Sequence, residues 1–395
     1  MQYLHRFPPS FHNPQGLLLL LLFVFIYQQQ QQGICNVRIR AERDELADVL
    51  VRASRAVGVR SPLPILQGIL CDVAGGKLTV TGTDNEVTVR TYLEVEVTED
   101  GRTVIPAKLA AEAVRKLPPG AVTLSSEDGQ VEIVGSGPRF KLREMVVDDY
   151  PKIVDAEIGD AVSVDGNELI KALSQVGVAA SGDDARPTLT GVLFEAIDEG
   201  LRLVATDSYR LAVKDVPGVS AEGSRLVPYR ALRELGRTVG GGEMQVALGD
   251  REASFVTDQG RLTVRVIDST FPNYRQLLPE GHANKLTLDK GALLDAVGRA
   301  ALVAEDHIPV RLAMHGGGVE LSVIRQEVGE ATELLEGEYV GEDMTIAFNT
   351  RYLTDGVNAV DDERIVIETS DPLKPGLLHG AELLDFRYLL MPVRL

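Results

Sequence analysis

Cysteine is scarce in this chain of 395 residues, which contains only Cys35 and Cys71. Two cysteines cannot build a disulfide scaffold of this size, and their spacing matches no zinc-binding pattern. We therefore expect a protein of a reducing compartment, the cytoplasm. Apolar residues make up 44% of the chain and charged residues 25%, so a large core can form without covalent cross-links.

Patterns that carry catalysis or cofactor binding are also missing. The sequence has no Gly-x-x-x-x-Gly-Lys loop for nucleotide phosphates. Its six histidines are dispersed, and none has metal-ligand spacing. The aspartate pairs at 148–149, 183–184 and 361–362 fall near expected loops, where we interpret them as solvated rather than as a magnesium site. The sequence thus predicts no catalytic residue, no metal and no cofactor, and the protein is not expected to be an enzyme.

Excess positive charge is lacking as well, because the formal net charge is −18. A DNA-binding domain usually presents a surplus of lysine and arginine, so this average argues against nucleic acid. An average can conceal a basic surface within an acidic protein. The distribution of the charges along the chain must therefore decide.

Residues 1–36 differ in composition from the rest. The run Leu17–Leu22 continues in apolar residues to Tyr27 and is followed by Gln28–Gln32. This run is about half of the ~20 residues that a membrane-spanning helix needs. Its length suits a signal peptide, but only Arg6 precedes it as a basic residue and no small-x-small cleavage site follows. We interpret 1–36 as a disordered or spurious leader ahead of a true start near Val37.

The remainder contains a threefold internal repeat, which decides the fold class before any other signal. The segment Arg60–Gly68 is echoed by Arg186–Gly191 and, more weakly, by Ile308–Leu312, with intervals between the shared prolines of 125 and 122. The segment Leu78–Asp84 matches Leu201–Asp207 at an interval of 123. In the third copy, Val319–Arg325 keeps only the alternation of apolar and polar residues of this second landmark.

Two further landmarks recur in the same order. A helix start recurs at intervals of 122 and 121, in Pro106–Leu109, Pro228–Ala231 and Asn349–Tyr352. A closing segment recurs at 121 and 120, in Asp149–Pro151, Thr270–Pro272 and Leu390–Pro392. Several landmarks in one order at one period predict three homologous domains, at 37–158, 159–283 and 284–395.

Each copy has the same periodicity. Helical spacing of apolar residues first appears in Ala41–Val57, Val164–Ala180 and Thr287–Val303. Alternating runs that indicate strands follow, as in 77–90 and 202–213. A second helix is expected at Pro106–Leu117, Pro228–Val239 and Asn349–Val360, and further strands at 129–145, 252–266 and 364–369. We predict an α+β fold with two helices packed on antiparallel sheet in each of three repeated domains.

The charge is not distributed evenly over these elements. The six expected helices together carry a net charge of +2, so the rest of the chain carries −20. The helices are thus the part of an acidic protein most favourable to phosphate, although ordinary solvated helix faces would look the same.

Four segments together resemble one family. They are Arg60–Gly68, Val204–Val213, Phe271–Arg275 and the terminal Tyr388–Leu395. In order and spacing this set resembles the bacterial replicative sliding clamp, the beta subunit of DNA polymerase III, over residues 37–395. The resemblance implies the DNA clamp fold, in which two chains join head to tail as a ring of six domains, with helices lining the hole and sheets outside.

The resemblance also implies a function. We expect a DNA polymerase processivity factor that encircles duplex DNA as a homodimer, without sequence preference. The implied partners are DNA polymerase III alpha and other polymerases, the clamp loader, and clamp-binding proteins of the mismatch-repair and ligase type. Two alternatives stay open: a clamp-fold paralogue that binds partner peptides without a replicative role, and an exported β-rich binding module that uses the leader.

Site residues are carried over by motif. The pocket for partner peptides is expected at Arg186, Leu189, Thr206, Ser208, Tyr209, Arg210, Leu211, Pro272, Gln276, Leu277, Leu389, Leu390, Met391, Pro392, Val393 and Arg394. Contacts to DNA are expected from Arg60, Arg52, Arg55, Lys108, Arg115, Arg230, Arg233, Arg237, Arg299 and Arg351. The dimer contact is expected to join Phe140 and Leu142 to Leu302 and Val303 of the other chain.

Three positions depart from the family's common pattern. Ser208 stands where glycine is often found, and Gln276 stands where arginine is frequent, so the preference for partner motifs can differ. Asp183 stands where some relatives have a polar amide that touches DNA, which would weaken that contact.

Overall fold

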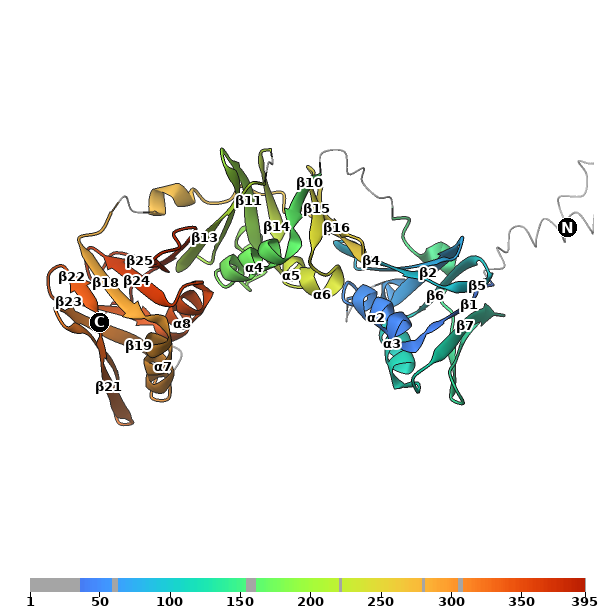
Figure 1. Cartoon of the computed structure of the whole chain (residues 1–395), viewed down its shortest axis with the longest axis horizontal. Coiled ribbons are helices and arrows are strands. Elements are labelled where there is room, and N and C mark those ends of the chain that lie inside the picture. The colour runs from blue at the N-terminus through green and yellow to red at the C-terminus, as the bar shows by residue number, and fades with distance from the viewer. Residues whose placement is uncertain are drawn as a thin grey trace, which may run out of the picture. The chain divides into compact units, whose positions relative to one another are not determined.

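The computed structural model describes residues 36–58, 63–153, 161–219, 222–278, 281–304 and 308–394 (Figure 1). Arg60 and nearly all of the leader lie outside the described residues. The chain divides into two compact units. Unit 1 extends to Gly82 and continues from Tyr92 to Lys152, and unit 2 contains Thr83–Thr91 and all residues from Ile153 onward.

Unit 1 contains two groups of antiparallel strands and two helices. The first sheet has the order β5 (Glu96–Glu99), β1 (Arg38–Glu42), β7 (Ala121–Glu127), β8 (Gln130–Val134), β9 (Arg139–Arg143). In the second group, β2 (Gly68–Ala74) pairs with β3 (Lys77–Thr83) and β6 (Gly101–Pro106). The helices α2 (Arg43–Ser54) and α3 (Ala107–Lys116) lie side by side (Figure 1).

The core of unit 1 follows from the spacing of its apolar residues. On α2 the buried residues include Leu46, Leu50 and Ala53, three and four positions apart, which places them on one face of the helix. The buried positions of α3 are four alanines and one valine, and such small side chains allow the helices to approach closely. This face packs on residues such as Ile69 and Leu124 of the strands.

Unit 2 contains three groups of strands, all paired antiparallel. The longest sheet has the order β14 (Ser224–Pro228), β11 (Gly191–Ile197), β12 (Gly200–Thr206), β13 (Arg210–Pro217), β26 (Phe386–Leu390), β25 (Gly376–Gly380), β24 (Arg364–Thr369), β18 (Asn284–Asp289), β22 (Glu338–Val340). A second group runs β10 (Val162–Asp165), β15 (Glu243–Leu248), β16 (Glu252–Thr257), β17 (Gly260–Arg265). The third runs β21 (Gly329–Glu336), β20 (Gly318–Arg325), β19 (Pro309–His315), β23 (Met344–Asn349).

The helices of unit 2 are α4 (Gly166–Gly177), α5 (Tyr229–Leu232), α6 (Leu235–Thr238), α7 (Lys290–Ala301) and α8 (Thr350–Ala359). The order strand, helix, four or five strands, helical segment, three strands thus occurs three times along the chain. The α+β class that the sequence predicts is confirmed, and the alternating run 202–213 is the hairpin of β12 and β13.

The copies are joined by the same kind of strand pairing. Residues 87–91, the first part of β4 (Val87–Glu94), pair with β17, the last strand of the second copy. In the same way β13 of the second copy pairs with β26, the last strand of the third. In each copy, the third strand after the first helix (β4, β13 and β21) is called here its third long strand. The third long strand of one copy therefore pairs with the final strand of the next copy.

Two details of the predicted helices are wrong. The first helices begin later than expected, because Arg38–Glu42, Val162–Asp165 and Asn284–Asp289 are strands. Asp165 and Asp289 fix the later starts of α4 and α7. The Asp165 carboxylate accepts hydrogen bonds from two backbone N–H groups of the first turn, and that of Asp289 accepts one from Ala292.

The expected helix Pro228–Val239 is broken into α5 and α6. At Glu234 and Arg237 the backbone N–H donates to the residue three positions earlier instead of four. Such tight turns interrupt the regular α-helical pattern. The apolar periodicity through this stretch is continuous and gave no sign of the break.

Cys71 lies on β2 in the core of unit 1. Burial raises the pKa of its thiol to about 12, so the thiol stays protonated and unreactive at neutral pH. Within the described residues, no helix has the length and apolarity to cross a membrane.

The close approach of β3 to α2 gives a stability prediction. A Cβ atom at Gly82 would overlap the carbonyl oxygen of Ala53. We expect Gly82→Ala to lower the free energy of unfolding of unit 1 by about 1–3 kcal/mol, the usual cost of overpacking. Urea unfolding measures it. Gly298→Ala is the control, because this α7 glycine has open space around it and alanine favours the helix; equal destabilisation by both changes would contradict the packing argument.

Candidate functional site

The turn between β12 and β13 is the centre of the candidate site. Asp207 Oδ1 accepts hydrogen bonds from the backbone N–H groups of Tyr209, at 2.9 Å, and Arg210, at 3.0 Å. The Thr206 hydroxyl donates to the carbonyl oxygen of Arg210 at 2.7 Å. These bonds hold Ser208 at φ 83°, in the left-handed region, and leave Tyr209 58% exposed at the tip.

The first copy of the repeat forms the same turn. Asp84 Oδ1 accepts from the N–H groups of Glu86 and Val87, and Thr83 donates to the carbonyl oxygen of Val87. The repeated Thr-Asp pair of the sequence is thus one turn, built twice by the same side-chain bonds. The tip residue differs, since Glu86 replaces Tyr209 and forms an ion pair with Arg230.

Arg210 follows the turn and is only 7% exposed. Its Nε donates to Asp207 Oδ2 at 3.0 Å, and one terminal nitrogen donates to Asp355 Oδ2 at 2.6 Å and lies 3.4 Å from the Tyr388 hydroxyl. Its guanidinium carbon lies 4.2 Å from the centre of the Tyr352 ring. We call Arg210, Asp207, Asp355 and Tyr388 the Arg210 network.

The Arg210 network connects the second copy of the repeat to the third. Asp355 and Tyr352 lie on α8, and Tyr388 lies on β26. Burial raises the pKa of Tyr388, so its hydroxyl stays protonated and donates to the carbonyl oxygen of Tyr352 at 2.9 Å. A buried arginine with two carboxylate partners is compensated, whereas removal of one partner would leave charge unpaired.

Two aromatic side chains meet above this network. The rings of Tyr209 and Tyr352, which we call the aromatic pair, lie 6.4 Å apart between their centres with an interplanar angle of 32°. Met391 lies close in space to this site, because its N–H donates to the carbonyl oxygen of Tyr209 at 2.9 Å. Tyr209 and Met391 are both exposed, which is the kind of surface that binds apolar anchors of a partner, and Leu277 on the segment before Leu278 is exposed as well.

Below the exposed residues lies a buried apolar cluster. It consists of Leu193, Val204, Leu211, Val213, Leu226, Tyr274 and Leu389, with Ile267, Phe271 and Leu278 packed against it. Leu211 and Leu389 are directly opposite each other across the β13–β26 pairing. The predicted residues Leu211 and Leu389 therefore meet, and both are buried.

The remaining predicted pocket residues are placed as follows. Pro272, Gln276 and Leu277 are exposed on the segment 266–278, which includes the turn η6 (Tyr274–Leu277). Leu189 is buried at the end of η5 (Pro187–Leu189), and Arg186, just before it, forms an ion pair with Asp183. Thr188 and Ser269 hydroxyls lie 2.8 Å apart and connect η5 to that segment.

The C-terminal residues divide between two environments. Leu390 is fully buried, and strand alternation directs it to the face of β26 opposite Leu389, so the structure does not bring it into the apolar cluster. Pro392 and Val393 are half-buried, and Val393 N–H donates to the carbonyl oxygen of Ala347. Arg394 is exposed.

Sequence reasoning missed Tyr352, Asp355 and Tyr274. Tyr352 and Asp355 lie on the helix that the Asn349 cap predicts, but nothing in their spacing indicates a contact with Arg210, 145 residues from Asp355. Tyr274 belongs to the family-like segment Phe271–Arg275, and its hydroxyl donates to Glu195 at 2.5 Å. The aromatic character of Tyr274 was the available signal.

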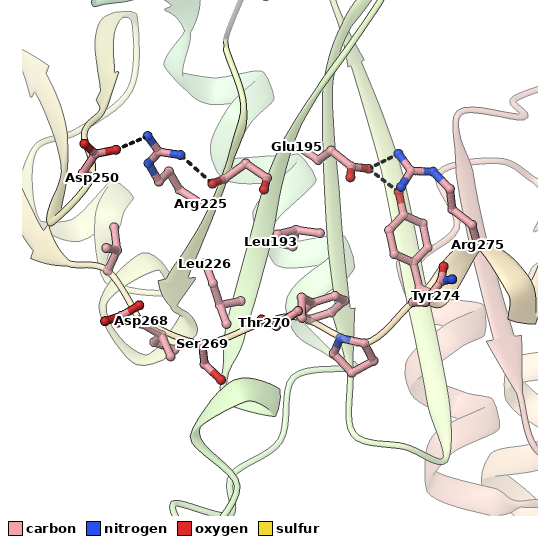
Figure 2. A pocket seen from close by; sticks show the side chains of 16 residues that line it. Leu193, Glu195, Arg225, Leu226, Asp250, Asp268, Ser269, Thr270, Tyr274 and Arg275 are labelled. Carbon is pink, nitrogen blue, oxygen red and sulfur yellow. Dashed lines mark hydrogen bonds and ion pairs between the residues drawn. The ribbon is translucent and has the colours of Figure 1, made fainter.

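A cavity of about 980 Å³ adjoins the apolar cluster and is shown in Figure 2. Its walls come from the segment 266–275 and from β11 and β14, and Leu193 and Leu226 form part of its floor. Charged side chains at its edges are paired within the wall: Glu195 with Tyr274 and Arg275, and Arg225 with Asp250. Asp268 also lines the cavity, so these pairings compensate most but not all of its charged side chains.

A second cavity, of about 1010 Å³, is lined by basic side chains. Arg230, Arg233 and Arg351, three of the expected DNA contacts, line it together with Arg210 and Arg265. Four acidic residues, Glu86, Asp184, Asp268 and Asp355, share the lining, so the local charge is nearly balanced. Arg230 pairs with Glu86, and Arg351 lies 4.0 Å from Asp355.

The other expected DNA contacts also lie on or next to helices. Arg52 and Arg55 lie at the end of α2, Lys108 and Arg115 on α3, Arg237 on α6 and Arg299 on α7. Arg52 pairs with Asp48, and Arg299 makes two bonds to Glu333. In the described part of the chain, no group of three or more histidine, cysteine, aspartate or glutamate side chains could hold a metal ion.

Models of three families cover most of the chain. The N-terminal, central and C-terminal domains of the DNA polymerase III beta subunit match residues 37–154, 163–273 and 275–394. The chain belongs to the DNA polymerase III beta subunit family. This membership confirms the resemblance and the clamp fold that the repeat and motifs predicted.

Individual relatives agree with this assignment. The beta sliding clamp of Streptomyces coelicolor is 32% identical over 91% of this chain and 100% of its own length. A beta sliding clamp homolog, GriR, of Streptomyces muensis is 30% identical over 91% of this chain and 99% of its own. The crystal structure of the beta sliding clamp of Caulobacter crescentus superimposes with a TM-score of 0.86 at 31% identity, covering 92% of this chain and 100% of that one.

The left-handed backbone at Ser208 gives a prediction for the clamp's turn. A non-glycine residue in this region costs about 1–3 kcal/mol, and the greater unfolded freedom of glycine offsets about 0.5–1 kcal/mol of that. We expect Ser208→Gly to stabilise unit 2 by about 0.5–1 kcal/mol in urea unfolding. Ser208→Val should destabilise it, because branching at Cβ disfavours this φ. A glycine variant that is less stable than the wild type would contradict the inference that the backbone at Ser208 is strained.

Proposed function

We propose that this chain is a DNA polymerase processivity factor that encircles duplex DNA as a ring-shaped homodimer and tethers partner proteins through the site around Tyr209. It performs no chemistry of its own. The observation that carries the proposal is the repeated strand pairing between copies. It leaves two strands, β9 and β21, as sheet edges that could pair in the same way with a second chain.

The open strands follow from the order of elements. The third long strand of the first copy pairs with β17, and that of the second copy pairs with β26. The equivalent strand of the third copy is β21, which pairs only with β20 among the described residues. The final strand of the first copy is β9, which is likewise an edge. Pairing of β21 with β9 of a second chain would repeat the junction and, done twice, close a ring.

The two edge strands have opposite charge. β9 reads Arg-Phe-Lys-Leu-Arg, whereas β21 carries Glu330, Glu333 and Glu336. Opposite charges across a strand pair stabilise it and disfavour the pairing of two identical strands. Phe140 is half-buried and Leu302 is 86% exposed, so both offer apolar surface to a partner. Leu142 is buried in its own core and offers little.

DNA binding of this kind is topological. The basic residues on the helices are few and several are paired with carboxylates, as Arg52, Arg230 and Arg299 are. Paired cations bind phosphate weakly, because a counterion within the protein must be displaced. Weak contacts permit sliding, while the closed ring prevents dissociation. A closed ring also needs a separate loader to open it around DNA.

Partner binding is assigned to the surface around the aromatic pair, Leu277 and Met391. Exposed apolar side chains above a buried apolar cluster suit a short peptide with apolar anchors. DNA polymerase III alpha, other polymerases, the clamp loader and repair proteins of the mismatch-repair and ligase type are the partners that we propose for this surface.

Retention on DNA tests the ring. Loaded by a clamp loader onto nicked circular DNA, the protein should stay bound through gel filtration, because a closed ring cannot leave a closed circle. Cutting the circle with a restriction enzyme should release it within minutes. Equal retention on circular and linear DNA would contradict topological binding and favour direct phosphate contacts.

Leu302 tests the dimer contact. We expect Leu302→Asp to shift the protein from dimer toward monomer in sedimentation, because a charge at an apolar interface loses about 2–4 kcal/mol or more. Leu384→Asp is the matched control, since Leu384 is also exposed, at 64%, but lies on the loop between β25 and β26, whereas Leu302 follows α7, which packs on β21. A dimer that survives Leu302→Asp would place the interface elsewhere.

A replicative role predicts complementation. The chain is nearly as similar to a clamp homolog as to a sliding clamp, so sequence identity does not separate a replicative clamp from a paralogue that binds partner peptides. Growth of a strain whose resident clamp is replaced by this chain supports the replicative role. Failure, together with intact peptide binding and ring formation, favours the paralogue.

A further inference from the structure

We propose that Arg210 and Asp355 act as positioning residues, which hold the aromatic pair in place for the partner peptide without contacting the peptide themselves. The inference rests on the proposed partner site and assigns to Arg210 a role different from the peptide contact expected from its motif. Its basis is the geometry of the Arg210 network.

Arg210 has little left to offer a ligand. Its Nε and one terminal nitrogen already donate to Asp207, Asp355 and Tyr388, and the Tyr352 ring covers its guanidinium at 4.2 Å. Only 7% of the residue is exposed, and it borders the cavity of about 1010 Å³, as does Asp355. A peptide that took over these bonds would displace partners that compensate a buried charge.

Arg210 is also unnecessary for the turn itself. The first copy forms the same turn around Thr83 and Asp84 with Val87 at the equivalent position. The arginine therefore adds something that the turn alone does not require. What it adds is the connection to α8, through Asp355 and the face of Tyr352.

This connection sets the position of both aromatic rings. Tyr209 precedes Arg210 in the chain, and its backbone N–H is held by the carboxylate of Asp207, which also binds the guanidinium. Tyr352 rests on the guanidinium and lies on the same helix as Asp355, three residues earlier. Loss of the Asp355 charge would free the guanidinium to move and uncouple Tyr352 from Tyr209.

The junction does not depend on this ion pair alone. β13 and β26 are joined by backbone pairing, and Asp215 on β13 binds both Arg202 and Arg387, the latter on β26. Asp215 is a matched control for Asp355, because their side chains are 28% and 29% exposed and each pairs with arginine. Asp215 pairs with Arg202 and Arg387 rather than with Arg210, so it reports the structural effect of losing one carboxylate at the same junction.

The test uses the full-length dimer and a fluorescent peptide that carries the clamp-binding segment of the polymerase III alpha subunit from the same organism. Affinity is measured by anisotropy for wild type, Asp355→Asn, Tyr352→Ala, the double variant and Asp215→Asn. Unfolding temperature is measured in parallel. We expect Asp355→Asn to weaken binding by about tenfold, a coupling typical of residues in contact.

The double variant separates positioning from direct contact. If Asp355 acts through the aromatic pair, the double variant binds no more weakly than Tyr352→Ala alone. Asp215→Asn should lower the unfolding temperature but leave the affinity unchanged. Unchanged affinity of Asp355→Asn, additive losses in the double variant, or an equal loss in Asp215→Asn would each overturn the proposal. A wild-type chain that does not bind the peptide would contradict the proposed partner site itself.

Discussion

Backbone pairing between the third long strand of one copy and the last strand of the next is the interaction on which the rest of the structure depends. It joins residues 87–91 to β17 and β13 to β26. Because the pairing is made of main-chain hydrogen bonds, it tolerates large differences in sequence between the copies. It also leaves β9 and β21 as edges of complementary charge, from which the proposed ring follows.

The same junction produces the candidate site. The β12–β13 turn emerges where β13 meets β26, so its tip residue faces the first turns of the helix of the next copy. At the first junction the tip is Glu86, which pairs with Arg230, and at the second it is Tyr209, which pairs with Tyr352. One repeated geometry thus gives an ion pair in one place and an exposed aromatic surface in the other.

Electrostatics explain how an acidic chain can serve DNA. A net charge of −18 excludes strong general attraction to phosphate, and several helix arginines are already paired with carboxylates. A ring that binds by enclosure needs no strong contact, and weak contact favours sliding. The buried Arg210 network uses charge differently, since there two carboxylates compensate one guanidinium and hold two copies in register.

The sequence by itself determined the threefold repeat, the α+β class, the Thr-Asp turns and the family, because each is encoded in residues close together in the chain. Only the tertiary structure decided that α5 and α6 are separate, that Leu390 faces away from Leu389, and that Arg210 is enclosed by Asp355 and Tyr352. The break between the two helices follows local backbone hydrogen bonds, while the other two features depend on which face of a strand meets the core and on contacts between residues more than a hundred positions apart. Local periodicity carries no information about either.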